Sequence, residues 1–165
     1  MASSRPSKPR QDKDVTISPI LEILVFVHQR DIIHRDVHPQ NLIRRTSDGK
    51  MVLIDFGSVK EISNWQQNIG QTKSRGGTQQ DYIPPEQAIG SPKLCSDIYA
   101  VGIIGIQALT GMKPKQFKVD NIGNLIWRQN AQVSPEFAKV LDRMILYDFP
   151  QRYPSATEAL QAIHN

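Results

Sequence analysis

The stretch "IIHRDVHPQNLI", from Ile32 to Ile43, sets acidic, basic and amide side chains beside an apolar run. Downstream, "MVLIDFG" is typical of a short strand, and a second acid, Asp55, lies at its exit. Hard cations prefer oxygen ligands, and a magnesium ion that holds a nucleotide usually takes one or two carboxylates besides phosphate oxygens. The amide of Asn41 and the carboxylate of Asp55 therefore form a candidate magnesium site.

The sequence on either side of this stretch predicts a helix before it and a hairpin after it. Ser18 is a candidate N-cap with Pro19 at the first helical position, and apolar residues recur at helical spacing as far as Arg30. The runs "NLIRR" and "MVLIDFG" flank "TSDGK", whose Asp-Gly pair indicates a hairpin turn. Between residues 58 and 85 the apolar periodicity vanishes. A long loop of this kind often carries function.

Three further helices are predicted toward the end of the chain. The run "SDIYAVGIIGIQALTG" is apolar on nearly every side, starts with a cap at Ser96 and Asp97, and ends at Gly111. The run "SPEFAKVLDRMIL" begins with Ser134 as its cap, and "SATEALQAI" opens with a capping box that starts at Ser155. We therefore expect residues 18–165 to form one mainly α-helical domain with a small β-hairpin.

Composition limits the class of protein. The chain has 165 residues, of which 39% are hydrophobic, so it has room for one domain with a modest core. No apolar run approaches the roughly eighteen residues of a membrane span. The single cysteine, Cys95, cannot close an internal disulfide, so nothing demands an oxidising compartment. We expect a cytoplasmic protein that does not associate with membranes.

The formal net charge is +4, and half of the excess lies in the first fourteen residues. Their serines, prolines and charges predict that residues 1–17 form a disordered basic tail. Bases and acids nearly balance in the rest of the chain, which leaves no basic face by count. A tail that binds nucleic acid therefore ranks last among three functional hypotheses, and we do not expect nucleic acid as a partner.

Several motifs together resemble one family. "HRDVHPQN" and "DFG" are similar to the catalytic loop and the metal-binding motif of protein kinases, H-R-D-x-x-x-x-N and D-F-G. Three further matches follow in the family's order: "YIPPE" resembles the end of the activation segment, "SDIYAVG" the start of the central helix, and "YDFPQR" the late arginine motif. The resemblance runs from about Ser18 to Asn165. It implies the C-terminal lobe of a eukaryotic-like serine/threonine protein kinase.

The resemblance implies roles for the residues of the opening stretch. Asp36 would accept or orient the proton of a substrate hydroxyl, while Asn41 and Asp55 would bind Mg²⁺ on the phosphates of ATP. Ile43 is assigned to the nucleotide site. His38 occupies the position of a lysine that faces the transferring phosphate in serine/threonine kinases. The expected cofactors are ATP and Mg²⁺, and the expected substrate is a protein.

Other positions are expected to act structurally or in regulation. His34 and Phe56 resemble the family's buried packing pair, followed by Gly57 of the D-F-G motif. Arg35 resembles the arginine that receives an activation-loop phosphate. Candidate acceptors of that phosphate are Ser63, Thr72, Ser74 and Thr78. Related small-molecule phosphotransferases usually carry glycine where Arg35 stands, which favours a protein substrate. Serine or threonine is the expected target, because Pro39 follows the serine/threonine form of the loop.

Three more residues are expected to fix the activation segment and the loop. Asp97 resembles the buried acid that holds the backbone of the catalytic loop from the start of the central helix. Glu86 and Arg152 match the ion pair that anchors the activation segment. Removal of one partner of such a buried pair costs about 3 to 5 kcal/mol.

Two departures from the family pattern bear on activity. An ordinary histidine is mostly neutral at neutral pH, so His38 does not supply the constant positive charge of the lysine it replaces. Phosphoryl transfer depends on such charge. In addition, Thr78 lies four residues before Tyr82, where the family's threonine usually lies three before, and Gln79 takes that slot.

The glycine-rich loop and strand lysine of the family's N-terminal β lobe have no match before Ser18. We therefore expect that lobe to be absent and activity to require a separate N-lobe. An open face that includes Ile43 and Leu53 would then aggregate or bind a partner. The second hypothesis is a catalytically degenerate, pseudokinase-like docking module, in which His38 and the shifted Thr78 record lost catalysis.

Overall fold

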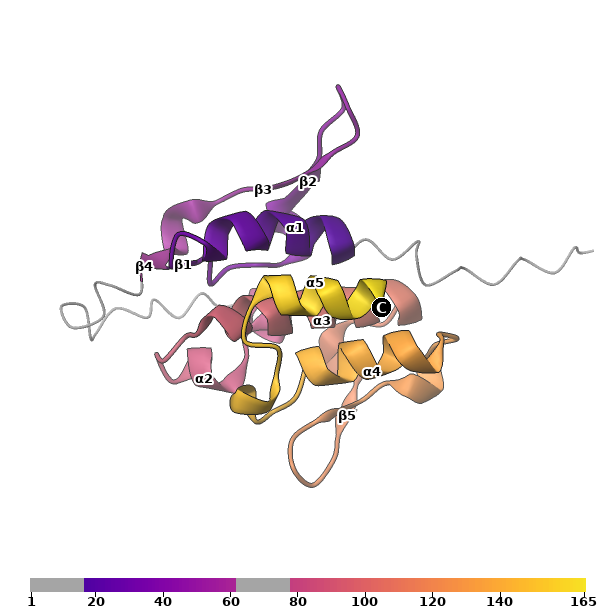
Figure 1. Cartoon of the computed structure of the whole chain (residues 1–165). Coiled ribbons are helices and arrows are strands. Elements are labelled where there is room, and N and C mark those ends of the chain that lie inside the picture. Colours follow the sequence, from indigo (N-terminus) through magenta and orange to yellow (C-terminus); the bar gives the residue numbers. More distant parts are fainter. Residues whose placement is uncertain (1–16, 62–77) are drawn as a thin grey trace, which may run out of the picture.

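The computed structural model describes residues 17–61 and 78–165 (Figure 1). Its α-helices are α1 (Ile17–His28), α2 (Pro85–Ala88), α3 (Leu94–Thr110), α4 (Pro135–Met144) and α5 (Ala156–His164). Its strands are β1 (Ile32–Ile33), β2 (Leu42–Arg44), β3 (Met51–Leu53), β4 (Lys60–Glu61), β5 (Lys118–Val119) and β6 (Leu125–Ile126). Short 3₁₀ helices span Pro39–Asn41, Phe56–Ser58, Thr78–Tyr82, Pro114–Gln116, Arg128–Asn130 and Phe149–Gln151. The predicted fold class, mainly helical with a small hairpin, is confirmed.

The core forms around α3, which packs against α1, α4 and α5. Ile98, Ile103 and Ile106 of α3 are almost completely buried, as expected for a helix that is apolar on nearly every side. Helix α1 lies along α5 and α3, and the β2–β3 hairpin projects on the α1 side of the molecule (Figure 1). The catalytic-loop motif therefore lies between α1, which precedes it, and α3, which supports it.

The helix ends agree only in part with the predicted caps. Ser134 accepts a hydrogen bond from the amide of Phe137 at 3.2 Å, and Ser155 caps α5 in the same way, as predicted. Helix α3, however, begins at Leu94, so Ser96 lies in its first turn and accepts from the amide of Lys93. The predicted cap was three residues too late, because Lys93 is the N-cap and Ser96 is the third residue of the helix.

The first helix also differs from its prediction at both ends. Ile17 is already helical, so Ser18 lies within α1 and is not its N-cap. The helix ends at His28, two residues before the predicted end at Arg30, and Asp31 follows in the left-handed region with φ 54°. The end of α3 is as predicted, because Gly111 adopts φ 69° and closes the helix.

The predicted hairpin is present and places the candidate site. Leu42 pairs with Leu53 and Arg44 with Met51 in an antiparallel register. The amide of Ile54 donates to the carbonyl of Asn41 at 2.9 Å, just beyond the ladder. The chain after β3 is therefore held beside the end of the catalytic-loop motif.

Two further strand pairs were not predicted. β1 pairs with β4, and β5 pairs with β6, in antiparallel two-stranded ladders. Two residues per strand are too few to produce a recognisable alternation. Within the predicted loop over 58–85, β4 and the helix Thr78–Tyr82 are ordered elements, and residues 62–77 lie outside the described residues. Over the described ranges, none of the helices combines the length and the apolar character that crossing a membrane requires.

Candidate active site

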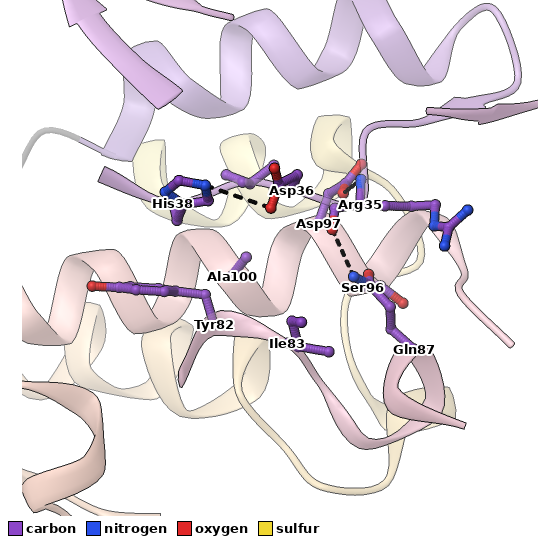
Figure 2. A pocket seen from close by; sticks show the side chains of 10 residues that line it. Arg35, Asp36, His38, Tyr82, Ile83, Gln87, Ser96, Asp97 and Ala100 are labelled. Carbon is purple, nitrogen blue, oxygen red and sulfur yellow. Dashed lines mark hydrogen bonds and ion pairs between the residues drawn. The ribbon is translucent and has the colours of Figure 1, made fainter. Parts of the chain in front are cut away.

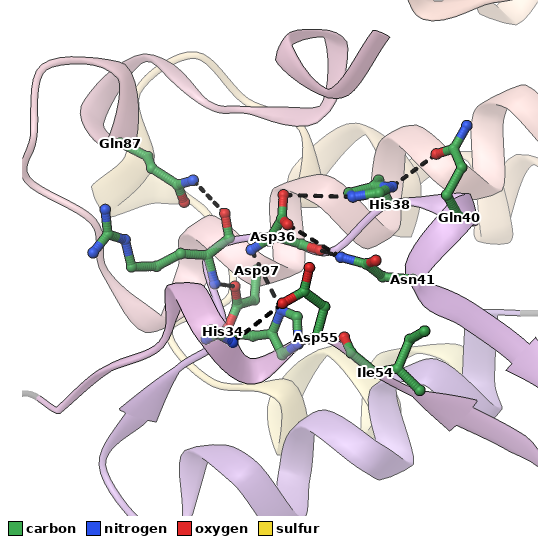
Figure 3. A network of polar contacts seen from close by, with 11 residues as sticks. His34, Asp36, His38, Gln40, Asn41, Ile54, Asp55, Gln87 and Asp97 are labelled. Atoms are coloured by element: carbon green, nitrogen blue, oxygen red, sulfur yellow. Dashed lines mark hydrogen bonds and ion pairs between the residues drawn. The ribbon is translucent and has the colours of Figure 1, made fainter. Parts of the chain in front are cut away.

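The backbone of the "HRD" motif is held by one buried carboxylate. Asp97, in the first turn of α3, is 1% exposed. Its Oδ2 accepts the amide of His34 at 2.9 Å, and its Oδ1 accepts the amide of Arg35 at 2.9 Å. Arg35 has φ 70°, which is uncommon for a residue with a side chain. The two hydrogen bonds to Asp97 therefore help to hold a strained backbone (Figure 3).

A third donor to this carboxylate was missed by sequence reasoning. The Nε2 of His28 lies 3.0 Å from Oδ2 of Asp97, and His28 is buried at the end of α1. Its only sequence signal is a polar ring at an apolar position of the helical pattern. Such a signal does not identify a partner 69 residues away.

Asp36 and Asn41 lie in contact with each other. Nδ2 of Asn41 donates to the backbone carbonyl of Asp36 at 2.8 Å and to its carboxylate at 3.2 Å. Both side chains are buried. The 3₁₀ turn Pro39–Asn41 brings the amide back toward the acid, and proline suits the first position of such a turn. The amide nitrogen of Asn41 is thus engaged with Asp36, which turns its oxygen to the other side.

Asp55 joins this pair through the hairpin. It follows Ile54, whose amide is bound to the carbonyl of Asn41, and it adopts φ 61°. Its carboxylate accepts the amide of Gly57 at 3.3 Å and is exposed. Three predicted residues therefore lie close together: Asp36 in the catalytic-loop motif, Asn41 in the turn after it, and Asp55 just after the hairpin (Figure 3). Ile43 lies next to them on β2 with 47% of its surface exposed, whereas Leu53, which was expected on the same open face, is 5% exposed and belongs to the core.

His34 packs under the D-F-G motif. Its ring meets that of Phe56 edge to face at a centroid distance of 4.6 Å. His34 is fully buried, but Phe56 is 44% exposed, so the expectation of a buried pair is wrong for Phe56. Phe56 is therefore covered on one side by His34 and is otherwise partly open to solvent.

The imidazole of His34 has a defined tautomer. Its Nδ1 accepts the amide of Asp36 at 3.3 Å, so its Nε2 carries the proton that is donated to the carbonyl of Ile54 at 3.1 Å. Burial lowers the pKa of His34 below 6.5, and it outweighs the carboxylates of Asp97, Asp36 and Asp55, which act in the opposite direction. A neutral His34 therefore fits both of its contacts.

His38 lies beside the carboxylate of Asp36 (Figure 2). Its Nε2 is 3.5 Å from Oδ1 of Asp36, and its Nδ1 is 2.7 Å from Oε1 of Gln40. The ring is 2% exposed and lies 6.3 Å from that of Tyr82, between centroids. It lines a small pocket with Asp36, Tyr82 and Ile83. Position 38, where the family has a lysine, is thus occupied by a buried histidine ring.

The Glu86 and Arg152 side chains form a buried ion pair. Two nitrogens of Arg152 donate to the two carboxylate oxygens of Glu86, at 2.7 and 3.2 Å. Ser96 donates its hydroxyl hydrogen to Glu86 at 2.7 Å, while its oxygen accepts the amide of Lys93 at the start of α3. The end of the activation-segment motif is thereby tied to both α3 and the late arginine motif.

The regulatory assignments rest partly on undescribed residues. Ser63, Thr72 and Ser74 lie outside the described residues, as does the side chain of Thr78. Arg35 is partly buried, and its Nε has no hydrogen-bond partner within the described parts of the chain.

The donor set at Asn41 and Asp55 fits Mg²⁺ bound together with a nucleotide. Both residues supply oxygen, the donor that this ion prefers, and Mg²⁺ usually takes only one or two carboxylates when phosphates complete its shell. Over residues 17–61 and 78–165 there is no cluster of three or more His, Cys, Asp or Glu side chains that could hold a metal ion. A site built only from protein ligands is therefore not what these residues offer.

The fold and this arrangement define the C-terminal lobe of a protein kinase. The sequence model of the protein kinase domain matches residues 3–164, so the chain belongs to the protein kinase family. The match begins within residues 1–17, the range that we predict to be a tail, most of which lies outside the described residues.

Relatives of the chain are serine/threonine-protein kinases of bacteria. It is 43% identical over 149 residues to serine/threonine-protein kinase C of Synechocystis sp., covering 87% of this chain and 28% of that protein. It is 41% identical over 157 residues to PknA of Nostoc sp., covering 92% of this chain and 27% of that protein. It is 30% identical over 165 residues to PknB of Mycolicibacterium smegmatis, with coverages of 93% and 26%. The chain spans 26–28% of the length of these three relatives.

Proposed function

We propose that this chain supplies the catalytic lobe for phosphoryl transfer from Mg-ATP to a serine or threonine hydroxyl of a protein. The observation that carries the proposal is the contact of Asn41 with both the backbone and the carboxylate of Asp36, at 2.8 and 3.2 Å. A carboxylate held in this way has a fixed direction, as a group that must meet a substrate hydroxyl requires.

The residues would divide the work as follows. Asp36 orients the attacking hydroxyl and accepts its proton, and the amide of Asn41 keeps the carboxylate in place. The oxygens of Asn41 and Asp55 would hold Mg²⁺, and Ile43 would contact the nucleotide from β2. Bound Mg²⁺ would neutralise charge on the phosphate oxygens. The tie from Asp97 to His34 and Arg35 keeps the loop from moving away from the site.

The partners follow from the same chemistry. The substrate is a protein, since the Glu86–Arg152 pair anchors the end of an activation segment. A kinase N-lobe, on this chain's full protein or on a separate one, would cover the exposed apolar side chains near the site. These are Ile43, Ile54, Phe56 and Val59, each between 37% and 47% exposed. We place the reaction in the cytoplasm, where ATP is available.

A docking module without catalysis is the second candidate. A buried histidine ring, His38, stands beside Asp36 at the position where the family places a lysine, whereas phosphoryl transfer depends on positive charge near the transferred group. The exposed apolar side chains near the hairpin would then serve a binding partner.

Phosphotransfer by the chain tests the first candidate. The chain and its Asp36→Asn variant would be assayed with Mg-ATP and a mixed protein substrate, alone and with a separately expressed kinase N-lobe. We expect incorporation to fall at least about hundredfold in the variant, as for loss of a general base. The control is Asp148→Asn, which changes an exposed acid outside the site.

Equal incorporation of phosphate by the parent and by Asp36→Asn would contradict the assignment of Asp36. If the parent transfers no phosphate but a protein partner binds the side of the hairpin that carries Ile43 and Ile54, docking is favoured.

A further inference from the structure

Gln87 makes a contact that no role above uses. It lies in α2, directly after Glu86, and is 8% exposed. Its side-chain Nε2 donates to the backbone carbonyl of Arg35 at 2.6 Å, across 52 residues of sequence. Figure 3 shows the amide of Gln87 reaching toward the loop from the side opposite Asn41. Because this buried side chain donates to the backbone of the catalytic loop, Gln87 is a candidate for a positioning role.

The carbonyl that Gln87 binds belongs to the same rigid peptide plane as the amide of Asp36. A peptide bond is planar, so a hydrogen bond at its carbonyl also limits the direction of its N–H. That N–H donates to Nδ1 of His34 at 3.3 Å. The plane between Arg35 and Asp36 is therefore held at one edge by Gln87 and at the other by His34.

This plane needs external support because of the backbone of Arg35. With φ 70°, Arg35 occupies a region that residues with a Cβ rarely adopt, and such conformations persist only where contacts impose them. Asp97 binds the amide of Arg35, which lies in the preceding plane. Gln87 binds the following one, which leads directly into Asp36. The two contacts therefore control the two planes on either side of the strained residue.

Gln87 is itself well anchored. Its neighbour Glu86 is fixed by Arg152 and by Ser96. A short chain of contacts thus leads from the late arginine motif, through α2, to the peptide plane before Asp36. Movement of α2 would be passed to the loop through one hydrogen bond.

We propose that Gln87 is a positioning residue that orients Asp36 through the carbonyl of Arg35 and makes that orientation depend on the placement of α2. The positional part concerns the loop alone, and the catalytic consequence rests on the proposed function of Asp36. Only a donor can do this work. Leucine at position 87 offers none, and an ionised carboxylate would set an acceptor against the carbonyl oxygen.

Amide hydrogen exchange of the whole chain, followed by NMR, tests the positional part. In Gln87→Leu and, near neutral pH, in Gln87→Glu, we expect the Asp36 amide to exchange about tenfold faster, because one hydrogen bond no longer restrains its plane. The amides of His34 and Arg35, which Asp97 holds, serve as internal references and should change by less than about threefold. Gln132→Leu, at an exposed position, is the matched control.

Acidification adds a readout that loss of packing would not produce. Burial raises the pKa of a carboxyl, so at about pH 5 the group introduced by Gln87→Glu regains an O–H donor. Protection of the Asp36 amide should then return in Gln87→Glu and stay low in Gln87→Leu. The isosteric Gln87→Glu variant also keeps the test valid where Gln87→Leu does not fold. Unchanged Asp36 protection in both variants, or equal loss of protection at all three amides, would overturn the proposal.

Phosphotransfer kinetics test the catalytic part. Under the conditions in which the parent is active, we expect Gln87→Leu to lower kcat about tenfold with little change of KM for ATP, because the nucleotide contacts lie elsewhere. A rise of KM at constant kcat would contradict a role through Asp36. An inactive parent would contradict the proposed function, and the exchange data would still decide the role of Gln87.

Discussion

The carboxylate of Asp97 accepts the backbone amide of His34 at 2.9 Å, although 63 residues separate them in the sequence. This contact joins the start of the central helix to the loop that carries Asp36. Asp97 also accepts the amide of Arg35 and lies 3.0 Å from the ring of His28. One buried acid therefore organises three segments, and its removal should affect both stability and the loop.

Asp97→Ala should lower the free energy of unfolding by about 3 kcal/mol, because buried donors lose a charged acceptor. Urea unfolding measures this change, with Glu22→Ala at an exposed position of α1 as the control. We also expect faster exchange of the His34 and Arg35 amides, which Asp97 binds. A loss below about 1 kcal/mol would show that water or other groups replace the carboxylate.

Arg152→Met should destabilise the fold by about 3 to 5 kcal/mol, because it leaves the buried carboxylate of Glu86 without its cation. Glu86→Gln combined with Arg152→Met should cost less than the sum of the two single changes, since neither variant group is charged. Urea unfolding of all four proteins completes the double-mutant cycle. Strict additivity of the two single changes would contradict a direct interaction.

Stability should fall as the pH drops below 6.5, the ordinary pKa of histidine, because burial lowers the pKa of His34 in the folded chain. The unfolded state then binds a proton that the folded state does not yet bind. The stabilisation is complete above 6.5 and is lost as the pH falls toward the lowered folded value. The free energy of unfolding, measured with urea at each pH, should change less with pH in His34→Gln than in the parent. Equal slopes would exclude His34 as the source, and His164→Gln, at an exposed ring, is the control.

Asp55→Asn should weaken the thermal shift caused by Mg-ATP with little effect on the stability of the chain alone, because its carboxylate is exposed. Surface changes of this kind usually alter stability by less than about 0.5 kcal/mol. Thermal unfolding with and without Mg-ATP measures both effects, with Asp148→Asn as the control. An undiminished shift in Asp55→Asn would argue against its role in metal binding.

Local patterns explain why some features could be predicted and others could not. The caps at Ser134 and Ser155 depend on residues three positions apart, so the sequence is enough to find them. Ser96 looks like a cap by the same local rule, but α3 begins at Leu94, and Ser96 lies in its first turn, where it donates to Glu86. Where such a helix begins therefore also depends on tertiary contacts, which a local sequence pattern does not contain.

In the candidate site, too, some residues could be found from the sequence and others only from the structure. Resemblance to kinases singled out Asp36, Asn41 and Asp55, which the fold brings to one place by the turn after His38 and by the hairpin. The contacts of His28 with Asp97 and of Gln87 with Arg35 join residues far apart in the chain. Neither residue stands out by type or spacing, so only the packed structure reveals these partners.

The packing of α3 on α4 should tolerate a methyl group at one glycine and not at another. A Cβ on Gly102 would lie 2.6 Å from Cγ2 of Ile145 and 2.9 Å from Cβ of Met144. At Gly105 the nearest atoms are Cγ2 of Ile17 and Cδ2 of Leu141, both at 3.1 Å, so these neighbours need to yield by only a few tenths of an ångström.

Gly102→Ala should therefore lower the free energy of unfolding by about 1 to 3 kcal/mol, as overpacking of a core does. In Gly105→Ala the gain in helix propensity, about 1 kcal/mol, should offset most of the milder clash. Urea unfolding of both variants makes the comparison at two helical glycines one turn apart. Equal costs would mean that Met144 and Ile145 yield as easily as Ile17 and Leu141, and that the helix contact is less rigid than its distances imply.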